Sequence, residues 1–367
     1  MIDVHESLGA SIGVFAGVRT ALDFGNPLEE HLETRRNVTV FDLSHMGRIV
    51  VRGTKAREFL NRLLAKDLEK SCDLRMFGPT AFLNERAGFV DDVMLYRLNE
   101  NEYLIVCNAV NVSKVIDWLH KHKELFGFTD VVIEDLTERT AMIAIQGPRA
   151  AETMINLGLS TTTSLKPLEF VYDERSFVNL PNATLISRSG WTGEDGFEVI
   201  GSITNVKALF VKLVRDLRVR PAGLIARDSL RIEMGFCLYG NEIDEDTNPL
   251  EARYWVFDID KQTEYVGRDA LFKVLADGVE KIRLGLRLKK GVRFVPRKGY
   301  EIYIGNRRIG VVTSGTYSPI LQRSIALAYI DSRHAVPGLE VEIDIRGRRY
   351  RAKLVDFPFV QPSSRPK

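Results

Sequence analysis

The sequence predicts an α+β protein in which two mixed units of helices and strands precede a small all-β domain. Upstream of Ala276 helical and strand patterns alternate, and residues 48–136 follow the order strand, helix, strands, helix, strand. That order is typical of a split βαβ unit with antiparallel character. From Lys281 onward the mixture gives way to short β patterns separated by glycine and proline turns. We therefore place a domain boundary at residues 276–279.

Composition and charge narrow the function classes. The chain has 367 residues, of which 45% are hydrophobic and 27% charged, which is ordinary for a soluble protein of two or three domains. A formal net charge of +2 is too close to balance to predict nucleic-acid binding. No apolar run could span a bilayer and residues 1–25 lack the core of a signal peptide, so we expect a cytoplasmic protein with no membrane partner. Three widely separated cysteines predict neither a disulfide framework nor a metal site.

The first mixed unit begins with a β-rich run over residues 40–51. Thr54 is a predicted N-cap for the following helix, whose apolar residues recur at helical spacing and give it one buried face. Ser113 is predicted to cap a second helix that ends at Gly127. Strands are expected over residues 80–83, 93–98, 103–107 and 131–133.

The second mixed unit repeats this pattern. A strand over residues 142–145 leads to a helix that begins at Pro148 and ends at Gly158, and further strands lead to a helix over residues 206–217. In the final all-β region, apolar and charged residues alternate over residues 339–346. This period of two gives each strand one dry face, so we expect a small barrel or sandwich.

The most informative stretch is residues 187–198, which read Ser-Arg-Ser-Gly-Trp-Thr-Gly-Glu-Asp-Gly-Phe-Glu. Three glycines in so short a span make a poor helix and a poor central strand, so the backbone is expected to turn tightly or to approach something closely. The glycines follow G-x-x-G-x-x-G rather than the dinucleotide spacing G-x-G-x-x-G. Glu194 and Asp195 would also repel a pyrophosphate, so we reject a nucleotide phosphate cradle.

A carboxylate in this stretch suits a planar ligand with two parallel N–H donors, because ionised glutamate is an acceptor with two oxygens. We therefore expect Glu198 to bind the edge of a heterocycle and Trp191 to cover its face. The alternative is a β-hairpin turn whose acids are solvated.

Two pairs of adjacent charged residues are candidate catalytic or ligand-binding residues. Asp91 and Asp92 end a turn and begin a strand, and because adjacent residues of a strand point to opposite faces, at most one of them faces a given cleft. Asp92 would act there as an acid, a base or a group that orients the ligand, or it simply ends the turn. Arg227 and Asp228 precede a predicted amphipathic helix. Asp228 would cap this helix, and Arg227 would hold an anionic group or form an ion pair.

Two polar stretches have plainer interpretations. Residues 238–246 are acidic and turn-like, but they lack the glycine and the terminal glutamate of an EF-hand, so we predict no metal site there. The hydroxyl-rich stretch 313–319 is expected to be a turn in the β region.

Taken together, these motifs resemble those of the glycine cleavage system T-protein (aminomethyltransferase) family, in the family's order and over essentially the whole chain. The stretches that carry the resemblance are residues 15–17, 41–47, 83–92, 145–148, 187–198, 226–231, 238–245 and 313–319.

The resemblance implies three domains arranged like a cloverleaf around a central tetrahydrofolate channel, with two ferredoxin-like α+β units and a jelly-roll-like β domain. The central folate-binding domain would comprise residues 1–50 and 140–275, the second α+β domain residues 51–139, and the β-barrel domain residues 280–367. The implied reaction passes the aminomethyl group from the lipoyl arm of H-protein to tetrahydrofolate, with release of ammonia.

The resemblance also implies roles for individual residues. In the family, the glutamate that matches Glu198 binds the aminopyrimidine edge of the pterin, and the aspartate that matches Asp92 is the residue most closely tied to catalysis. Arg227 matches an arginine beside the folate, and Met46 and Asn108 match positions that line the folate site.

Some positions depart from the family pattern. Val18 replaces a tryptophan, Pro79 replaces an aromatic residue, and Trp191 and Phe236 replace tyrosines at folate-binding positions. The rings of Trp191 and Phe236 would still stack on folate, whereas the loss of the two tyrosine hydroxyls removes hydrogen bonds. Two alternatives therefore stay open. One is a folate-dependent demethylase or methyltransferase with another one-carbon donor. The other is a non-catalytic folate-binding protein of the iron–sulfur-maintenance branch, although Cys237 is displaced from the cysteine of that branch's motif.

Overall fold

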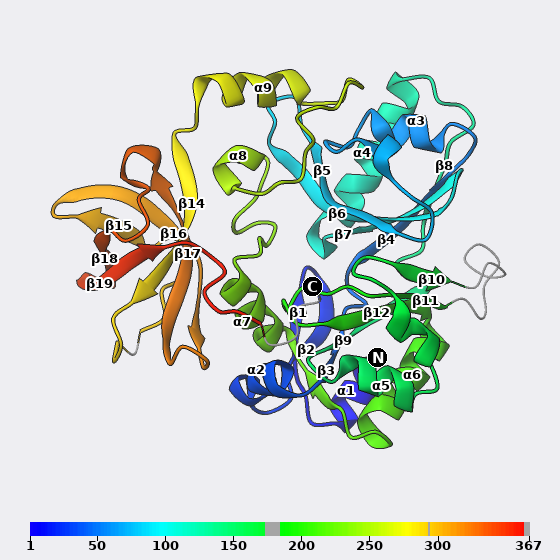
Figure 1. Cartoon of the computed structure of the whole chain (residues 1–367), viewed down its shortest axis with the longest axis horizontal. Coiled ribbons are helices and arrows are strands. Elements are labelled where there is room, and N and C mark those ends of the chain that lie inside the picture. The colour runs from blue at the N-terminus through cyan, green and yellow to red at the C-terminus, as the bar shows by residue number, and fades with distance from the viewer. Residues whose placement is uncertain (173–183, 293, 363–367) are drawn as a thin grey trace.

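Two mixed sheets and a barrel make up the structure (Figure 1), a computed structural model that describes residues 1–172, 184–292 and 294–362. The barrel lies at one end of the long axis, and the two sheets lie together at the other end. The predicted mixed α+β architecture and the all-β character of the final domain are confirmed. The predicted domain limits stay predictions.

The first sheet has six strands, in spatial order β10 (Phe170–Tyr172), β11 (Thr184–Ser187), β12 (Gly196–Ser202), β9 (Thr140–Gln146), β3 (Thr39–Asp42) and β13 (Arg220–Ala222). Neighbouring strands are antiparallel, except that β13 and β3 are parallel. Side chains along β12 alternate between two cores. Phe197 and Val199 pack with residues of α1 (Ile2–Ser7), α5 (Ala150–Asn156) and α6 (Ile203–Arg215), whereas Ile200 faces the second sheet.

The second sheet has five strands, in spatial order β5 (Met76–Leu83), β6 (Phe89–Asn99), β7 (Glu102–Cys107), β4 (Gly47–Arg52) and β8 (Val132–Asp135). All neighbouring pairs are antiparallel, as the sequence predicts. Helices α3 (Ala56–Asn61) and α4 (Val112–Leu125) pack on one face, where Leu119 is fully buried. The opposite face meets the first sheet in a shared core that contains Tyr96 and Met142.

Both helix caps predicted in this unit are wrong. α3 starts two residues after Thr54, whose hydroxyl donates instead to Asp130 at 2.6 Å. Ser113 already lies inside α4, because a 3₁₀ turn over Ala109–Asn111 leads directly into the helix. An N-cap must directly precede the first helical turn, and neither hydroxyl has that position.

The barrel is closed by six strands, in the order β14 (Lys281–Leu288), β17 (Arg323–Asp331), β16 (Arg307–Ser318), β15 (Glu301–Ile304), β18 (Glu340–Ile345) and β19 (Arg348–Val355). Every neighbouring pair is antiparallel. Along β18, buried Val341, Ile343 and Ile345 alternate with more exposed acids, which confirms the predicted period of two. α8 (Pro249–Ala252) and α9 (Arg268–Asp277) precede the barrel.

A buried ion pair joins the barrel to α7 (Leu224–Met234) and to the segment that follows this helix. Arg231 donates to Glu242 and to Ser314 of β16, both at 2.7 Å, and Thr313 donates to Glu242 at 2.6 Å. Burial alone would raise the pKa of Glu242, but the Arg231 guanidinium and the hydroxyl donors hold that pKa below its ordinary value. The prediction of a turn over residues 313–319 is wrong as far as Ser318, because β16 continues to that residue, and the hydroxyls of Thr313 and Ser314 contact this buried pair.

Helix α7 (Leu224–Met234), which carries Arg231, starts earlier than predicted. Its N-cap is Gly223, so Arg227 and Asp228 lie inside the helix and the prediction of an Asp228 cap is wrong. A Cβ at position 223 would lie 2.2 Å from the carbonyl oxygen of Leu22. The close approach of this N-terminus to β2 (Val18–Asp23) therefore requires glycine.

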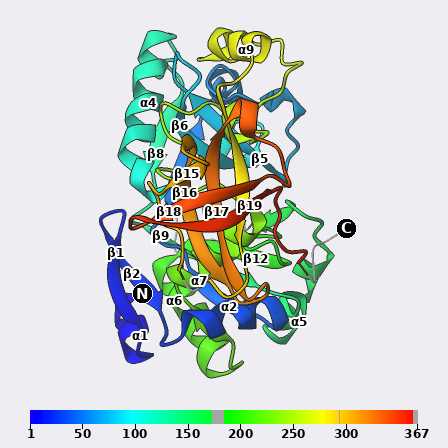
Figure 2. The same cartoon turned by 90° about the vertical axis from the view of Figure 1, so that its left-hand side faces the viewer.

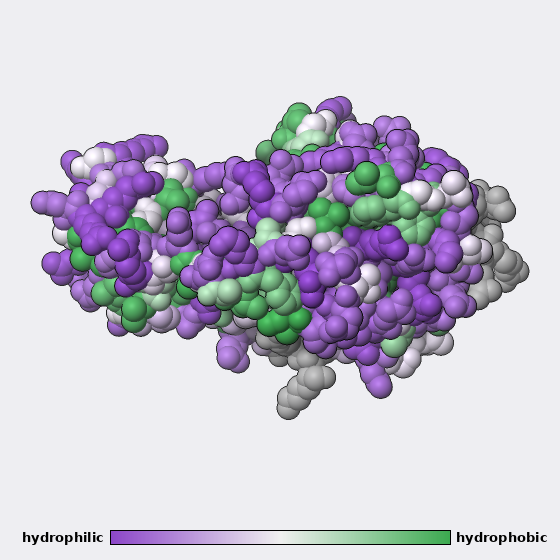
Figure 3. Space-filling model, turned by 90° about the horizontal axis from the view of Figure 1, so that it is seen from above, coloured by the Kyte–Doolittle hydropathy of each residue, from purple (hydrophilic) through white to green (hydrophobic). Residues whose placement is uncertain are grey.

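The N-terminal segment forms a hairpin of β1 (Ser11–Phe15) and β2, followed by α2 (Pro27–Arg36). Figure 2 shows this hairpin at the edge of the molecule beside α1. The face seen in Figure 3 is largely hydrophilic, with apolar side chains in separate patches. Within the described ranges, no helix combines the length and the apolar character needed to cross a membrane.

Candidate functional site

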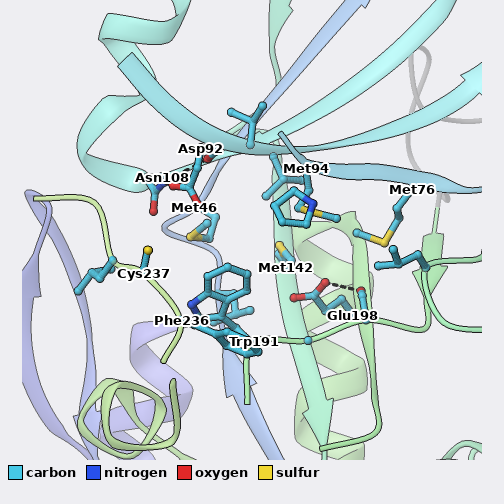
Figure 4. Close-up of a pocket in the computed structure, with 18 of the residues that line it drawn as sticks. Met46, Met76, Asp92, Met94, Asn108, Met142, Trp191, Glu198, Phe236 and Cys237 are labelled. Atoms are coloured by element: carbon cyan, nitrogen blue, oxygen red, sulfur yellow. Dashed lines mark hydrogen bonds between the residues drawn. The ribbon is translucent and has the colours of Figure 1, made fainter. Parts of the chain in front are cut away.

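A cavity of about 410 Å³ lies between the two sheets, in the range typical of small-molecule sites (Figure 4). Its walls come from both sheets, from α7 and from the segments that follow α7 and α8. All seven site residues predicted from the sequence line this cavity: Met46, Asp92, Asn108, Trp191, Glu198, Arg227 and Phe236.

Glu198 reaches the cavity because of its register on β12. Its strand partner is Ala144 of β9, and its neighbours Phe197 and Val199 point to the opposite core. Ser189 donates to its Oε2 at 2.5 Å. Burial raises the pKa of Glu198, and this hydrogen bond and the Arg227 charge act in the opposite direction. The expectation of a poor central strand is wrong from Gly196 onward, because β12 is an interior strand of its sheet.

Two glycines of this stretch are needed for space. Gln146 packs against the loop over residues 188–195, and it donates to the Ser189 carbonyl at 3.0 Å. A Cβ at Gly190 or Gly196 would lie 1.9 Å or 2.2 Å from the Gln146 amide. The loop therefore lies tightly on β9, as the close approach predicted from the glycines requires.

The acids of this loop are buried and paired rather than solvated. Asp195 accepts from Arg188 at 2.7 Å, and Glu194 accepts from Arg35 at 3.1 Å. Arg35 also donates to the Thr192 carbonyl at 2.8 Å and to Glu233 at 2.9 Å. The alternative of a simple turn with solvated acids is therefore wrong. These pairs fix the loop that carries Trp191.

Two aromatic rings form one wall of the cavity. The ring centroids of Trp191 and Phe236 are 4.7 Å apart at an interplanar angle of 39°. Phe236 follows α7, whose C-cap Gly235 has a left-handed backbone with φ of 73°. A Cβ at Gly235 would lie 2.4 Å from the ring of Phe357, so glycine allows the turn that directs Phe236 to the cavity.

Only one of the adjacent aspartates 91 and 92 faces the cavity, as strand alternation predicts: Asp92 lines it and Asp91 does not. The Asn108 side-chain amide donates to both, at 2.7 Å to Asp92 and 2.8 Å to Asp91. Asn111 donates to Asp91 at 2.6 Å, and the Tyr254 hydroxyl donates to Asp92 at 2.9 Å. Burial raises the pKa of both carboxyls, that of Asp91 to about 8 with the Asp92 charge as a further cause.

Arg227 projects into the cavity from α7. No residue that the structure describes forms a hydrogen bond or ion pair with its guanidinium. Burial lowers the pKa of Arg227, while the charge of Glu198 opposes that change. The cavity thus presents a cation and two carboxylates on an otherwise largely apolar lining. Such a set suits a flat ligand with polar groups at its edge and a hydrogen-bond acceptor or anion elsewhere.

Two family models together match most of the chain. Residues 1–261 match the family model described as the GCVT N-terminal domain, and residues 281–361 match the glycine cleavage T-protein C-terminal barrel domain. The chain belongs to the glycine cleavage T-protein family.

Relatives of this family support the assignment over full length. A probable aminomethyltransferase of Aeropyrum pernix is 43% identical, with 99% of this chain and 97% of the relative covered. An aminomethyltransferase of Thermus thermophilus is 41% identical, with 98% of each chain covered. The crystal structure of glycine cleavage system aminomethyltransferase T from Bartonella henselae is 36% identical, with a TM-score of 0.91 over 100% of this chain and 98% of that chain.

Sequence reasoning missed several cavity residues of this family member. Met94 lies two residues after Asp92 on β6, so alternation alone could have placed it on the same face. Met76, Met142 and Tyr254 also line the cavity, and their positions depend on tertiary packing. Among the four departures from the family pattern, Pro79, Trp191 and Phe236 line the cavity, whereas Val18 lies on the hairpin and is 44% exposed.

Proposed function

We propose that this T-protein family member transfers the aminomethyl carbon of glycine from the lipoyl arm of H-protein to tetrahydrofolate, with release of ammonia. The observation that carries the proposal is the single cavity that brings Glu198, the two rings and Asp92 together. The full-length relatives named aminomethyltransferase support the same activity.

The residues of the cavity fit tetrahydrofolate. Its aminopyrimidine edge offers adjacent N–H donors, and Glu198 offers two acceptor oxygens from a buried position. Trp191 and Phe236 supply apolar faces for a flat ring, and Met46 adds a thioether that adapts to its shape. Arg227 supplies a cation for a carbonyl or carboxylate oxygen of the ligand. When bound, tetrahydrofolate supplies the two nitrogens that take up the transferred carbon.

The chain's own contribution is to hold the reactants and to move a proton. Positioning two reactants in one enclosed site supplies much of the rate enhancement of such a transfer. Asp92 is the group proposed to accept or orient a proton at its carboxylate oxygens. Burial raises its pKa, which makes it a stronger base than an exposed aspartate. Asn108 fixes the direction of this carboxylate by its hydrogen bond.

The proposal includes the finer domain description. Residues 1–50 and 140–275 would form the central folate-binding domain, residues 51–139 the second ferredoxin-like unit, and residues 280–367 the jelly-roll-like barrel of a cloverleaf. Separate hydrophobic cores under α5 and α6, under α3 and α4, and inside the barrel support this division.

The test is release of ammonia and methylenetetrahydrofolate from aminomethylated H-protein, with tetrahydrofolate binding measured by calorimetry. We expect Asp92→Asn to lower turnover by about 100- to 10,000-fold with little change in folate affinity. Tight folate binding without release would favour the demethylase or the non-catalytic alternative. No folate binding would refute all three.

A further inference from the structure

We propose that Tyr254 is a positioning residue for the reaction, which acts through Asp92 by holding its carboxylate in one orientation and favouring its ionised form. This inference rests on the function proposed above. Tyr254 lines the cavity, but neither the motifs of the sequence nor its spacing singled it out.

The contacts of Asp92 give Tyr254 this role. Asn108 donates to Oδ1 at 2.7 Å, and the Tyr254 hydroxyl donates to Oδ2 at 2.9 Å. Each carboxylate oxygen therefore has one side-chain donor among the described residues and keeps lone-pair capacity toward the cavity. Two donors on different oxygens prevent rotation of the carboxylate, so its free lone pairs face the ligand.

The surroundings of Asp92 make these hydrogen bonds important. No ion pair to Asp92 is found in the part of the chain that the structure describes. Glu198 and Arg227 line the same cavity, but the titratable groups whose electrostatic interaction with Asp92 is resolved are Asp91, Cys237, Tyr239 and Tyr254. None is a cation, and burial raises the pKa of the Cys237 thiol to about 12. Hydrogen bonds from Asn108 and Tyr254 are therefore the main compensation for burying this charge.

The barrel holds Tyr254 in place through one buried arginine. Tyr254 follows α8 and Arg253, whose left-handed backbone has φ of 50°. Arg283 of β14 donates to the Ala252 carbonyl at 2.7 Å and to the Gly235 carbonyl at 2.6 Å. It thus fixes both turns that lead into the cavity, one before Tyr254 and one before Phe236. The Tyr254 ring also stacks on Phe89, with centroids 6.3 Å apart.

The closing experiment compares Tyr254→Phe with Tyr265→Phe. Both remove one hydroxyl from a tyrosine of the same hydrophobic cluster, but the buried hydroxyl of Tyr265 has no hydrogen-bond partner among the described residues. We expect Tyr254→Phe to move the acid limb of the kcat/KM profile to higher pH by about one pH unit, because a donor to the charged form is lost. We expect no change in the KM for tetrahydrofolate or in the Tyr265→Phe profile.

A second readout needs no turnover. Carboxyl-¹³C-labelled aspartate, with Asp92→Asn to assign the signal, reports the titration of Asp92 in the ligand-free chain. Its midpoint should rise in Tyr254→Phe and stay unchanged in Tyr265→Phe. If the wild type is active and Tyr254→Phe changes neither the titration midpoint of Asp92 nor the pH profile of kcat/KM, the inference is overturned. An inactive wild type that binds no folate would instead overturn the proposed function, whatever the titration shows.

Discussion

Replacement of Glu198 by glutamine separates recognition of the ligand edge from simple filling of the cavity. Glutamine has the same size, so packing of β12 is preserved, but one acceptor oxygen becomes an NH₂ group that meets a ligand donor. A hydrogen bond to a charged group contributes about 1.5–3 kcal/mol. Because 1.4 kcal/mol corresponds to a factor of about ten, we expect Kd for tetrahydrofolate to rise about 10- to 100-fold.

Titration calorimetry of tetrahydrofolate against the wild type and Glu198→Gln measures this change. The matched control is Glu152→Gln, because Glu152 is on the surface and pairs with Arg149 away from the cavity. Burial raises the pKa of Glu198, so affinity of the wild type should fall on acidification at a higher pH than an ordinary carboxyl would cause. Equal affinities for Glu198→Gln and the wild type would refute the assignment of Glu198 to the ligand edge.

Three other outcomes are expected. Trp191→Ala should raise Kd for tetrahydrofolate by about 3- to 10-fold, by calorimetry, because one stacking face is lost. Arg231→Met should lower the free energy of unfolding by about 3–5 kcal/mol in denaturant titrations, because Glu242 is left buried without its cation. The stability that protonated Asp91 contributes is fully present below its unfolded pKa of 3.8 and is lost as pH rises through about 8. The free energy of unfolding should fall across this window by up to about 1.4 kcal/mol per pH unit, and a flat profile would contradict the burial of Asp91.

Local patterns predicted the elements that carry their own periodicity. The antiparallel second sheet follows from the order of strands and helices, and the alternation along β18 follows from hydrophobic spacing. Strand alternation also predicted that only one of Asp91 and Asp92 faces a cleft, but the choice of Asp92 came from the family resemblance. The boundaries were less predictable. Thr54, Ser113 and Asp228 all have good capping side chains, yet each helix starts at another residue.

The cavity could be predicted only where a resemblance or a local chemical pattern pointed to it. Glu198 stands out as a carboxylate in a glycine-rich stretch, whereas Tyr254 is one tyrosine in an ordinary loop. The role of Tyr254 depends on Arg283, which lies 29 residues after Tyr254 in the sequence and on a strand of the barrel. No periodicity or spacing encodes a contact of that kind, because it arises only when the barrel packs on the turns beside the cavity.

The charged motifs of this chain have two physical roles that look alike in sequence, and the roles differ in whether the charges form an ion pair within the protein. Among the residues that the structure describes, Glu198 and Arg227 face the cavity without an ion-pair partner, whereas Glu242 and Arg231 are buried and neutralise each other. Both roles need charged residues beside glycines or hydroxyls, so composition and spacing cannot separate them. The energetic consequences differ, because loss of Arg231 or Glu242 removes a direct hydrogen-bonded ion pair from a buried partner, whereas Glu198 and Arg227 influence each other through charge across the cavity. Variants of the first pair should therefore change affinity at little cost in stability, and variants of the second should unfold the junction on which the cavity depends.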